Sequence, residues 1–148
     1  MTQHAFKVHL KWRSGKDHVG QLEGDVIHAP FSIPNALGGV GVGTNPDELL
    51  VSAAGSCFTL SLAATLERAR IDVIALDVKS VGTASFKNHK FSMENITHNV
   101  NIYVQNVETK DQLNQRLERL IHIADRNCMV SNSIRRNVAI HIHPSIII

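Results

Sequence analysis

Residues 44–58 read TNPDELLVSAAGSCF, and with their continuation to Arg70 they predict one long helix. Asn45 is typical of an N-cap, and Pro46 has the φ angle that a first helical residue needs. Glu48 can reach back to the N–H of the cap and complete a capping box. The sequence therefore predicts that this helix begins at Pro46, after the cap at Asn45.

The interior of this helix carries no charged residue from Leu49 to Leu66, and its apolar positions lie all around the helix axis. Such a helix is buried in a protein core or in a bilayer. Its length suits a membrane span, but strand-like segments that need a sheet to pair with flank it. It also holds six small or hydroxyl-bearing residues, Ser52, Gly55, Ser56, Thr59, Ser61 and Thr65. We therefore expect a core helix and no membrane partner.

The composition suits a single domain spanning residues 1–148. A formal net charge of +2 is far from the basic surface that nucleic-acid binding requires, so no nucleic-acid partner is expected. Residues 1–10 contain no apolar segment typical of an export signal, which favours a cytoplasmic location. In a reducing compartment, two cysteines are more often catalytic or redox-active than structural.

The remaining segments predict an α+β fold of strands, helix, strands, two helices and a last strand. Residues 6–13 alternate apolar and polar side chains, which is the pattern of a strand with one buried face. Glycines and prolines make 29–43 a loop, and Lys87–Lys90 a turn between two strands. The predicted strands are 6–13, 18–28, 72–86, 91–104 and 138–143, and the shorter helices are 109–127, opened by a capping box at Thr109, and 128–136.

The two cysteines, Cys57 and Cys128, are either small buried residues or a reactive pair. A nucleophilic cysteine reacts as the thiolate. Cys57 lies about twelve residues beyond the N-cap, roughly 18 Å along the axis, where the dipole of its own helix no longer acts. A cation from elsewhere would have to favour the thiolate, and the candidates are Lys16 and Arg13, with Lys11 beside them. For any single one of these three, a solvated basic strand face is the favoured explanation.

Asp47 and two histidines are the other candidate site residues. Asp47 precedes Cys57 by ten residues, roughly 15 Å along the axis, so the two side chains cannot touch within one straight helix. A role for Asp47 at the thiol would require a partner subunit, and its position at the positive end of the helix dipole explains it equally well. His141 and His143 share one side of a strand but lack a third ligand, so no metal is expected.

Three motifs closely resemble the OsmC/Ohr family of organic hydroperoxide reductases. They are GTNPDELL at 43–50, the alanines at 53–54 followed by Cys57, and CMVSN at 128–132. The resemblance implies an intertwined homodimer with antiparallel sheets around a long central helix, two sites between the subunits and no cofactor. It also implies a thiol peroxidase that reduces small organic hydroperoxides. Cys57 matches the peroxidatic cysteine and Cys128 the resolving cysteine, whose disulfide an external thiol, such as a lipoyl group or a low-molecular-weight thiol, then reduces.

The chain departs from the family pattern at three points. Asp47 replaces the usual glutamate, Met129 replaces a proline, and the family's active-site arginine has no counterpart except Lys16 in the early hairpin. A lysine keeps the charge but loses the bidentate fork of arginine. A different class of function therefore stays open, a non-enzymatic OsmC-like protein that binds an apolar ligand or senses oxidants.

Overall fold

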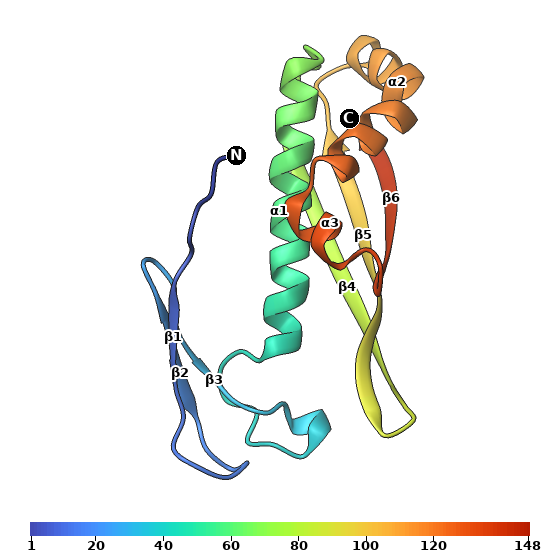
Figure 1. The fold of residues 1–148 in the computed structure, drawn as a ribbon. Helices are drawn as coiled ribbons and strands as arrows, with labels where there is room; N and C mark the ends of the chain where they lie inside the picture. The colour runs from blue at the N-terminus through green and yellow to red at the C-terminus, as the bar shows by residue number, and fades with distance from the viewer. The chain divides into compact units, whose positions relative to one another are not determined.

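The computed structural model describes residues 1–148, and the chain forms two compact units, Met1–Leu49 and Leu50–Ile148 (Figure 1). The expectation of one domain over 1–148 stays a prediction. The mixture of strands and helices confirms the predicted α+β class. Each unit has its own three-stranded sheet, with strand orders β1-β2-β3 and β4-β5-β6.

The first unit contains a small antiparallel sheet made of β1 (Val8–Lys11), β2 (Gly20–Gly24) and β3 (His28–Phe31). The strand predicted at 18–28 was wrong, because a turn closed by the Gly24 N–H to the Ile27 carbonyl, 2.8 Å, divides that segment. A 3-10 helix, η1 (Asn35–Leu37), follows within the predicted loop. Leu22 is the only buried apolar side chain of this unit. The unit therefore has almost no core of its own.

The long helix is α1 (Pro46–Arg68), and Asn45 caps it as predicted, because its Oδ1 accepts the Glu48 N–H at 2.9 Å. The Glu48 carboxylate accepts from the Thr44 hydroxyl at 2.8 Å, where we expected it to accept from the N–H of Asn45. By length and composition, α1 is long and apolar enough to cross a bilayer. Core helices of soluble proteins can meet the same criterion, and 33% of the most apolar 18-residue window of α1 is buried.

The helix ends at Arg68, two residues before the predicted end. Arg70 has a φ of 58°, in the left-handed region. Its N–H bonds the Glu67 carbonyl and the Ile71 N–H bonds the Leu66 carbonyl, which together form a Schellman motif. Glycine usually occupies this position because a side chain there costs energy. An arginine therefore terminates the helix at a conformational cost.

We predict that Arg70→Gly raises the free energy of unfolding by about 0.5–1 kcal/mol, because glycine adopts positive φ without strain. Arg68→Gly, two residues earlier and still helical, should lower it by about 1 kcal/mol. Urea unfolding of both variants provides the measurement. Equal destabilisation by the two substitutions would show that the left-handed position is not strained.

The second unit has a mixed sheet of β4 (Ala75–Lys87), β5 (Lys90–Tyr103) and β6 (Ala139–Ile147). The strands β4 and β5 are antiparallel, but β6 runs parallel to β5, so the expectation of antiparallel sheets is wrong for β6. A parallel neighbour needs a long crossover, which the intervening helices provide. The predicted turn at 87–90 is confirmed, and the positive φ angles of Asn88 and His89 indicate a type I′ hairpin.

Two helices make the crossover, α2 (Val107–Arg126) and α3 (Met129–Ile134). The N-cap of α2 is Asn106, whose side chain accepts the Thr109 N–H at 2.8 Å, so the capping box predicted from Thr109 is not the start of this helix. Asn127 ends α2, as predicted. Cys128 then serves as the N-cap residue of α3, so α2 and α3 are separated by only two residues.

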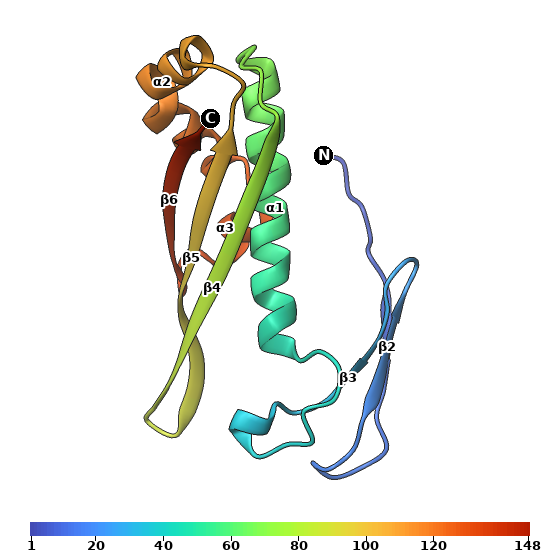
Figure 2. The ribbon, with the colours of Figure 1, turned by 180° about the vertical axis from the view of Figure 1, so that it is seen from behind.

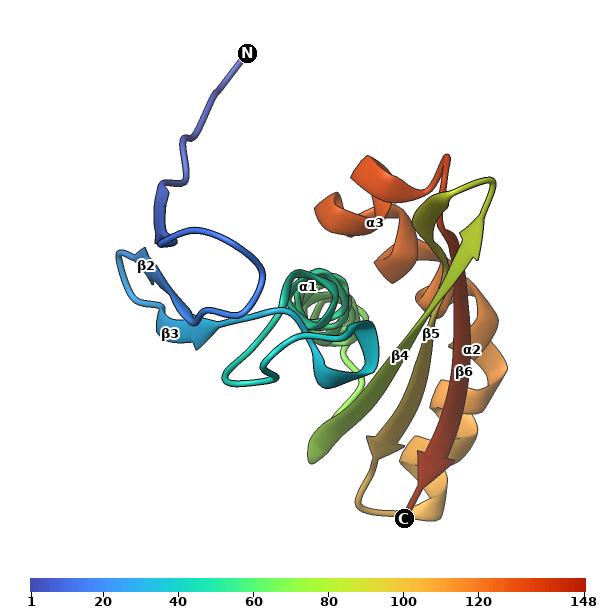
Figure 3. The same cartoon turned by 90° about the horizontal axis from the view of Figure 1, so that it is seen from below.

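The core of the second unit lies between the helices and one face of the sheet. Figure 2 shows β5 between β4 and β6, and Figure 3 shows α1 and α3 on the same side of this sheet. The buried cluster draws on α1, β5, α2 and the α3 cap: Phe58, Leu62, Leu66, Ile71, Val100, Ile102, Val104, Leu113, Leu120, Ala124 and Cys128. Both cysteines therefore belong to one hydrophobic core.

Candidate functional site

The structure brings Cys57 and Cys128 together, although 71 positions separate them in the sequence. Cys57 is half-buried on α1 and packs against the core cluster that contains Cys128. Cys57 lies close enough to Cys128 to contribute to the raised pKa of the Cys128 thiol. Neither thiol forms a disulfide.

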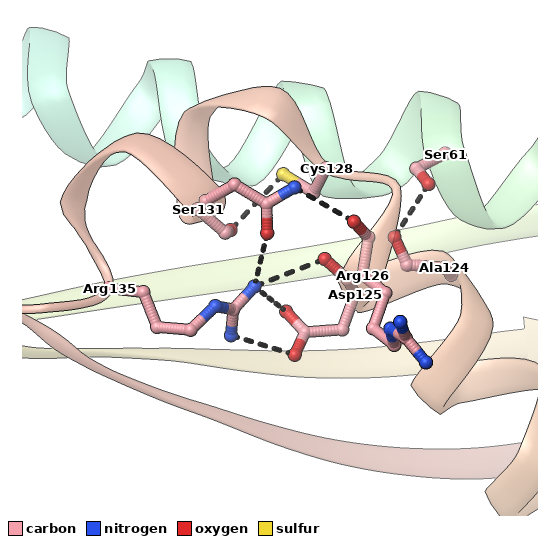
Figure 4. Close-up of polar contacts among 8 residues, drawn as sticks. Ser61, Ala124, Asp125, Arg126, Cys128, Ser131 and Arg135 are labelled. Atoms are coloured by element: carbon pink, nitrogen blue, oxygen red, sulfur yellow. Dashed lines mark hydrogen bonds and ion pairs between the residues drawn. The ribbon is translucent and has the colours of Figure 1, made fainter.

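Cys128 is a buried thiol, with 0% of its surface exposed. Burial is the main cause that raises the pKa of Cys128, and the nearby Cys57 raises it further. The Ser131 hydroxyl donates to the Cys128 Sγ at 3.1 Å and opposes this shift, as does a backbone hydrogen bond from the same residue (Figure 4). Cys128 therefore carries its proton at neutral pH.

The turn that carries Cys128 is held on both sides by polar contacts (Figure 4). On the α2 side, the Ser61 hydroxyl of α1 donates to the Ala124 carbonyl at 2.6 Å. On the α3 side, Arg135 forms an ion pair with Asp125 at 2.9 Å. Sequence reasoning missed Ser131, Asp125 and Arg135. The available signal for Ser131 was its position three residues after a cysteine at a predicted helix start, where a hydroxyl faces the first turn.

A second buried polar group, His98 on β5, lies in the same core and is 0% exposed. Its ring stacks on Phe58 with a centroid separation of 5.3 Å and an interplanar angle of 4°. Its Nδ1 lies 2.6 Å from the Ser80 hydroxyl, while its Nε2 is buried without a hydrogen-bond partner. Burial lowers the pKa of His98, and the negative charge of Asp125 partly offsets this shift. His98 is therefore neutral at pH 7.

We predict that the protein loses stability as the pH falls below about 6.5, because the unfolded chain then binds a proton that buried His98 does not yet accept. His98→Phe keeps a ring against Phe58 and should remove this part of the pH dependence. The measurement is the free energy of unfolding in urea at pH 7.5 and pH 5.5. His141→Phe, on the exposed face of β6, should retain the parent's dependence; an unchanged slope in His98→Phe would contradict the assignment.

The other predicted site residues belong to the first unit, Met1–Leu49. Asp47 is exposed in the first turn of α1. Lys16 is exposed and pairs with Asp17 at 3.0 Å, and its ammonium group also reaches the Gly38 carbonyl at 3.4 Å. Arg13 is exposed beyond the end of β1. Their roles at the thiol stay predictions.

His141 and His143 are exposed on β6, as expected for strand histidines facing solvent. No group of three or more His, Cys, Asp or Glu side chains is arranged to hold a metal ion. A cavity of about 490 Å³ lies around the C-terminal end of α1 and the segment that follows it. Its lining is mainly apolar and includes neither cysteine: Ala63, Leu66, Glu67, Arg70, Ile71, Asp72, Val73, Ala75 and Leu76.

Comparison with known proteins decides the family. Residues 38–143, which include both cysteines, match a family described as OsmC-like protein. The chain belongs to this family. An uncharacterised Bacillus subtilis protein, YmaD, is 30% identical over 146 residues, covering 99% of this chain and 97% of YmaD. The family predicted from the sequence motifs is therefore confirmed.

Solved structures of OsmC-like proteins share the fold. A Legionella pneumophila protein described as an organic hydroperoxide resistance protein OsmC has a TM-score of 0.79 and 21% identity, covering 98% of this chain and 99% of that one. The Bacillus subtilis organic hydroperoxide resistance protein OhrB has a TM-score of 0.72 and 21% identity, covering 96% and 98%. These similarities confirm the OsmC-like fold.

Proposed function

We propose that this OsmC-like protein is a thiol peroxidase that reduces organic hydroperoxides to alcohols in the cytoplasm. The observation that carries the proposal is the meeting of a half-buried Cys57 and a fully buried Cys128 in one core. A buried cysteine that served only to pack would not need a second thiol in the same cluster. Two adjacent free thiols can lose two electrons and form a disulfide.

The first step is oxidation of Cys57, the more accessible of the two thiols. Its thiolate attacks the terminal oxygen of the hydroperoxide, the O–O bond breaks, and the alkoxide leaves with the bonding electron pair. A proton from solvent converts the alkoxide to the alcohol, while Cys57 becomes a sulfenic acid. Because Cys57 is only half-buried, a small hydroperoxide can approach it more readily than the buried Cys128.

The second step forms the disulfide between Cys57 and Cys128. The Cys128 sulfur attacks the Cys57 sulfur, the S–O bond breaks, and the departing hydroxide combines with the proton of Cys128 to form water. An external thiol must then reduce the disulfide, and it can reach the Cys57 sulfur more readily than the buried Cys128 sulfur. The buried cysteine therefore acts as the resolving residue and as the leaving group in reduction.

Replacing each cysteine should separate the two steps. Cys57→Ser should abolish turnover of cumene hydroperoxide, because the nucleophile is removed. Cys128→Ser should consume one equivalent of peroxide per chain and then stall, because Cys57 cannot be resolved. Peroxide consumption over several equivalents is measured with dithiothreitol for the parent and Cys57→Ser, and without added thiol for Cys128→Ser, because dithiothreitol would itself reduce the sulfenic acid of Cys57. Full activity of Cys57→Ser would contradict the mechanism.

A titration of free thiols separates this mechanism from the alternative of a non-enzymatic protein that binds an apolar ligand. The cavity at the C-terminal end of α1, whose lining includes neither cysteine, is the observation that favours the alternative. One equivalent of cumene hydroperoxide should remove both thiols rapidly if the protein is a peroxidase. Unchanged thiols would favour the binding protein.

We also propose that the active form is a homodimer. The first unit has one buried apolar side chain and exposes several large ones, and Leu60 of α1 is 72% exposed. Soluble proteins seldom leave such surfaces uncovered. A second copy would cover them and could bring Asp47 together with Lys16 or Arg13 near the Cys57 of its partner, because Asp47 cannot reach the Cys57 of its own straight helix.

Light scattering coupled to size-exclusion chromatography should give twice the 16.3 kDa mass of one chain. Leu60→Asp should shift the protein towards the monomer, because it places a charge on the exposed apolar face of α1. Glu67→Gln, an exposed substitution on the same helix, serves as the control and should leave the mass unchanged. A parent protein that elutes as a monomer at micromolar concentration would contradict the proposal.

A further inference from the structure

Three side chains form a polar clasp around the residue that we assign as the resolving cysteine. The clasp consists of Asp125 at the end of α2, Asn132 on α3 and Arg135 just after α3. Figure 4 labels Asp125 and Arg135. The Arg135 guanidinium donates to both carboxylate oxygens of Asp125, at 2.9 and 3.2 Å. It also donates to the Asn132 Oδ1 at 3.1 Å and to the Asp125 carbonyl at 3.2 Å.

The clasp closes the turn from α2 into α3 on both sides of Cys128. The Cys128 N–H donates to the Asp125 carbonyl at 3.2 Å, and this carbonyl is also held by Arg135. On the other side, the Asn132 N–H donates to the Cys128 carbonyl at 3.0 Å. The Asn132 amide group donates to the Arg126 carbonyl at 2.8 Å and so ties α3 back to α2. Every backbone polar group of Cys128 is therefore fixed by a residue of the clasp.

These contacts are more specific than a surface ion pair. Two parallel hydrogen bonds between a guanidinium and a carboxylate fix the relative orientation of both side chains. The Asp125 side chain is 19% exposed and the Arg135 side chain 39%, so solvent screens the pair only in part. The ion pair between Lys87 and Glu94, at 3.6 Å on the β4–β5 hairpin, has one contact and more exposed side chains. It provides a matched comparison away from the cysteines.

We propose that the Asp125–Asn132–Arg135 clasp is a positioning unit that holds the Cys128 sulfur against Cys57 and thereby sets how often a sulfenic acid is resolved instead of over-oxidised. This inference rests on the proposed peroxidase function. The chemistry of Cys57 needs no help from the clasp in its first step, because none of the three side chains contacts Cys57. Resolution depends on it, because a displaced sulfur forms the S–S bond slowly.

Two reactions of the Cys57 sulfenic acid compete. In resolution, the Cys128 sulfur displaces hydroxide, and the proton of its thiol completes a water molecule. In over-oxidation, the sulfenic acid, as its anion, attacks a second hydroperoxide, breaks its O–O bond and becomes sulfinic acid, while the alkoxide takes a proton and leaves as alcohol. Only the first reaction involves Cys128. A looser clasp should therefore shift the outcome towards sulfinic acid without changing the rate at which Cys57 first reacts.

The test compares Arg135→Gln and Asp125→Asn with Arg135→Lys and with the control Lys87→Gln. In the parent and in each variant, rapid quenching and mass spectrometry of the intact chain follow sulfenic acid, disulfide and sulfinic acid after addition of cumene hydroperoxide. We expect Arg135→Gln and Asp125→Asn to slow disulfide closure about tenfold or more, and to raise the sulfinic acid formed per turnover accordingly. Lysine should recover part of the loss, and Lys87→Gln should match the parent.

Two further measurements distinguish a positioning role of the clasp from a general loss of structure. The rate of the first oxidation, measured in the Cys128→Ser background, should change less than about twofold, because the clasp acts only on the resolving side. In glutathione redox buffers, which need no peroxide, the effective concentration of Cys128 at Cys57 should fall about tenfold in Arg135→Gln. Unchanged closure, unchanged sulfinic acid and an unchanged effective concentration would overturn the proposal. A parent protein whose Cys57 does not react with peroxide would instead overturn the peroxidase function, while the glutathione measurement would still test the clasp.

Discussion

The close contact of α1 with the second sheet is the constraint on which the site depends. Gly55 packs directly on β4, where an added Cβ would lie 2.6 Å from the Ser80 hydroxyl oxygen. A glycine within a helix costs about 1 kcal/mol relative to alanine, so this close approach is retained at an energetic cost. One turn further, the Phe58 ring lies flat on His98. With these two contacts the depth and rotation of α1 are fixed, and Cys57, the residue before Phe58, is placed with them.

Cys128 reaches the same core by a different route. Because β6 runs parallel to β5, the chain must cross from one end of the sheet to the other between these strands. The crossover consists of α2 and α3, and the short turn between them passes beside α1, where the Ser61 hydroxyl binds the last turn of α2 at the Ala124 carbonyl. The direction of one strand pair therefore decides where the second sulfur lies. An antiparallel β6 would have removed the need for this crossover.

Sequence reasoning succeeded where the signal is local. The cap at Asn45, the turn at 87–90 and the end of α2 at Asn127 each depend on residues within a few positions of one another. The alternation at 6–13 predicted a strand with one buried face, but all four residues of β1 are exposed. Sequence reasoning failed where two local signals competed for the start of a helix, or where contacts between distant segments determine how strands pair. The structure caps α2 at Asn106 and not at the predicted Thr109, because asparagine and threonine both suit an N-cap. The pairing of β6 depends on a crossover that no short pattern specifies. The two cysteine positions were read from the sequence, but their meeting is a property of topology.

The unequal burial of the two sulfurs gives the proposed cycle its direction. A nucleophile must meet peroxide, and the half-buried Cys57 can do so, whereas Cys128 has no exposed surface. Because burial raises the pKa of Cys128, its thiol keeps a proton until the sulfenic acid forms beside it, and that proton leaves with the departing oxygen as water. Burial also disfavours the Cys128 thiolate that must leave when the disulfide is reduced, and this favours the oxidised pair. Ser131 opposes this effect with a hydrogen bond to the Cys128 sulfur, so one hydroxyl moderates how strongly the core resists reduction.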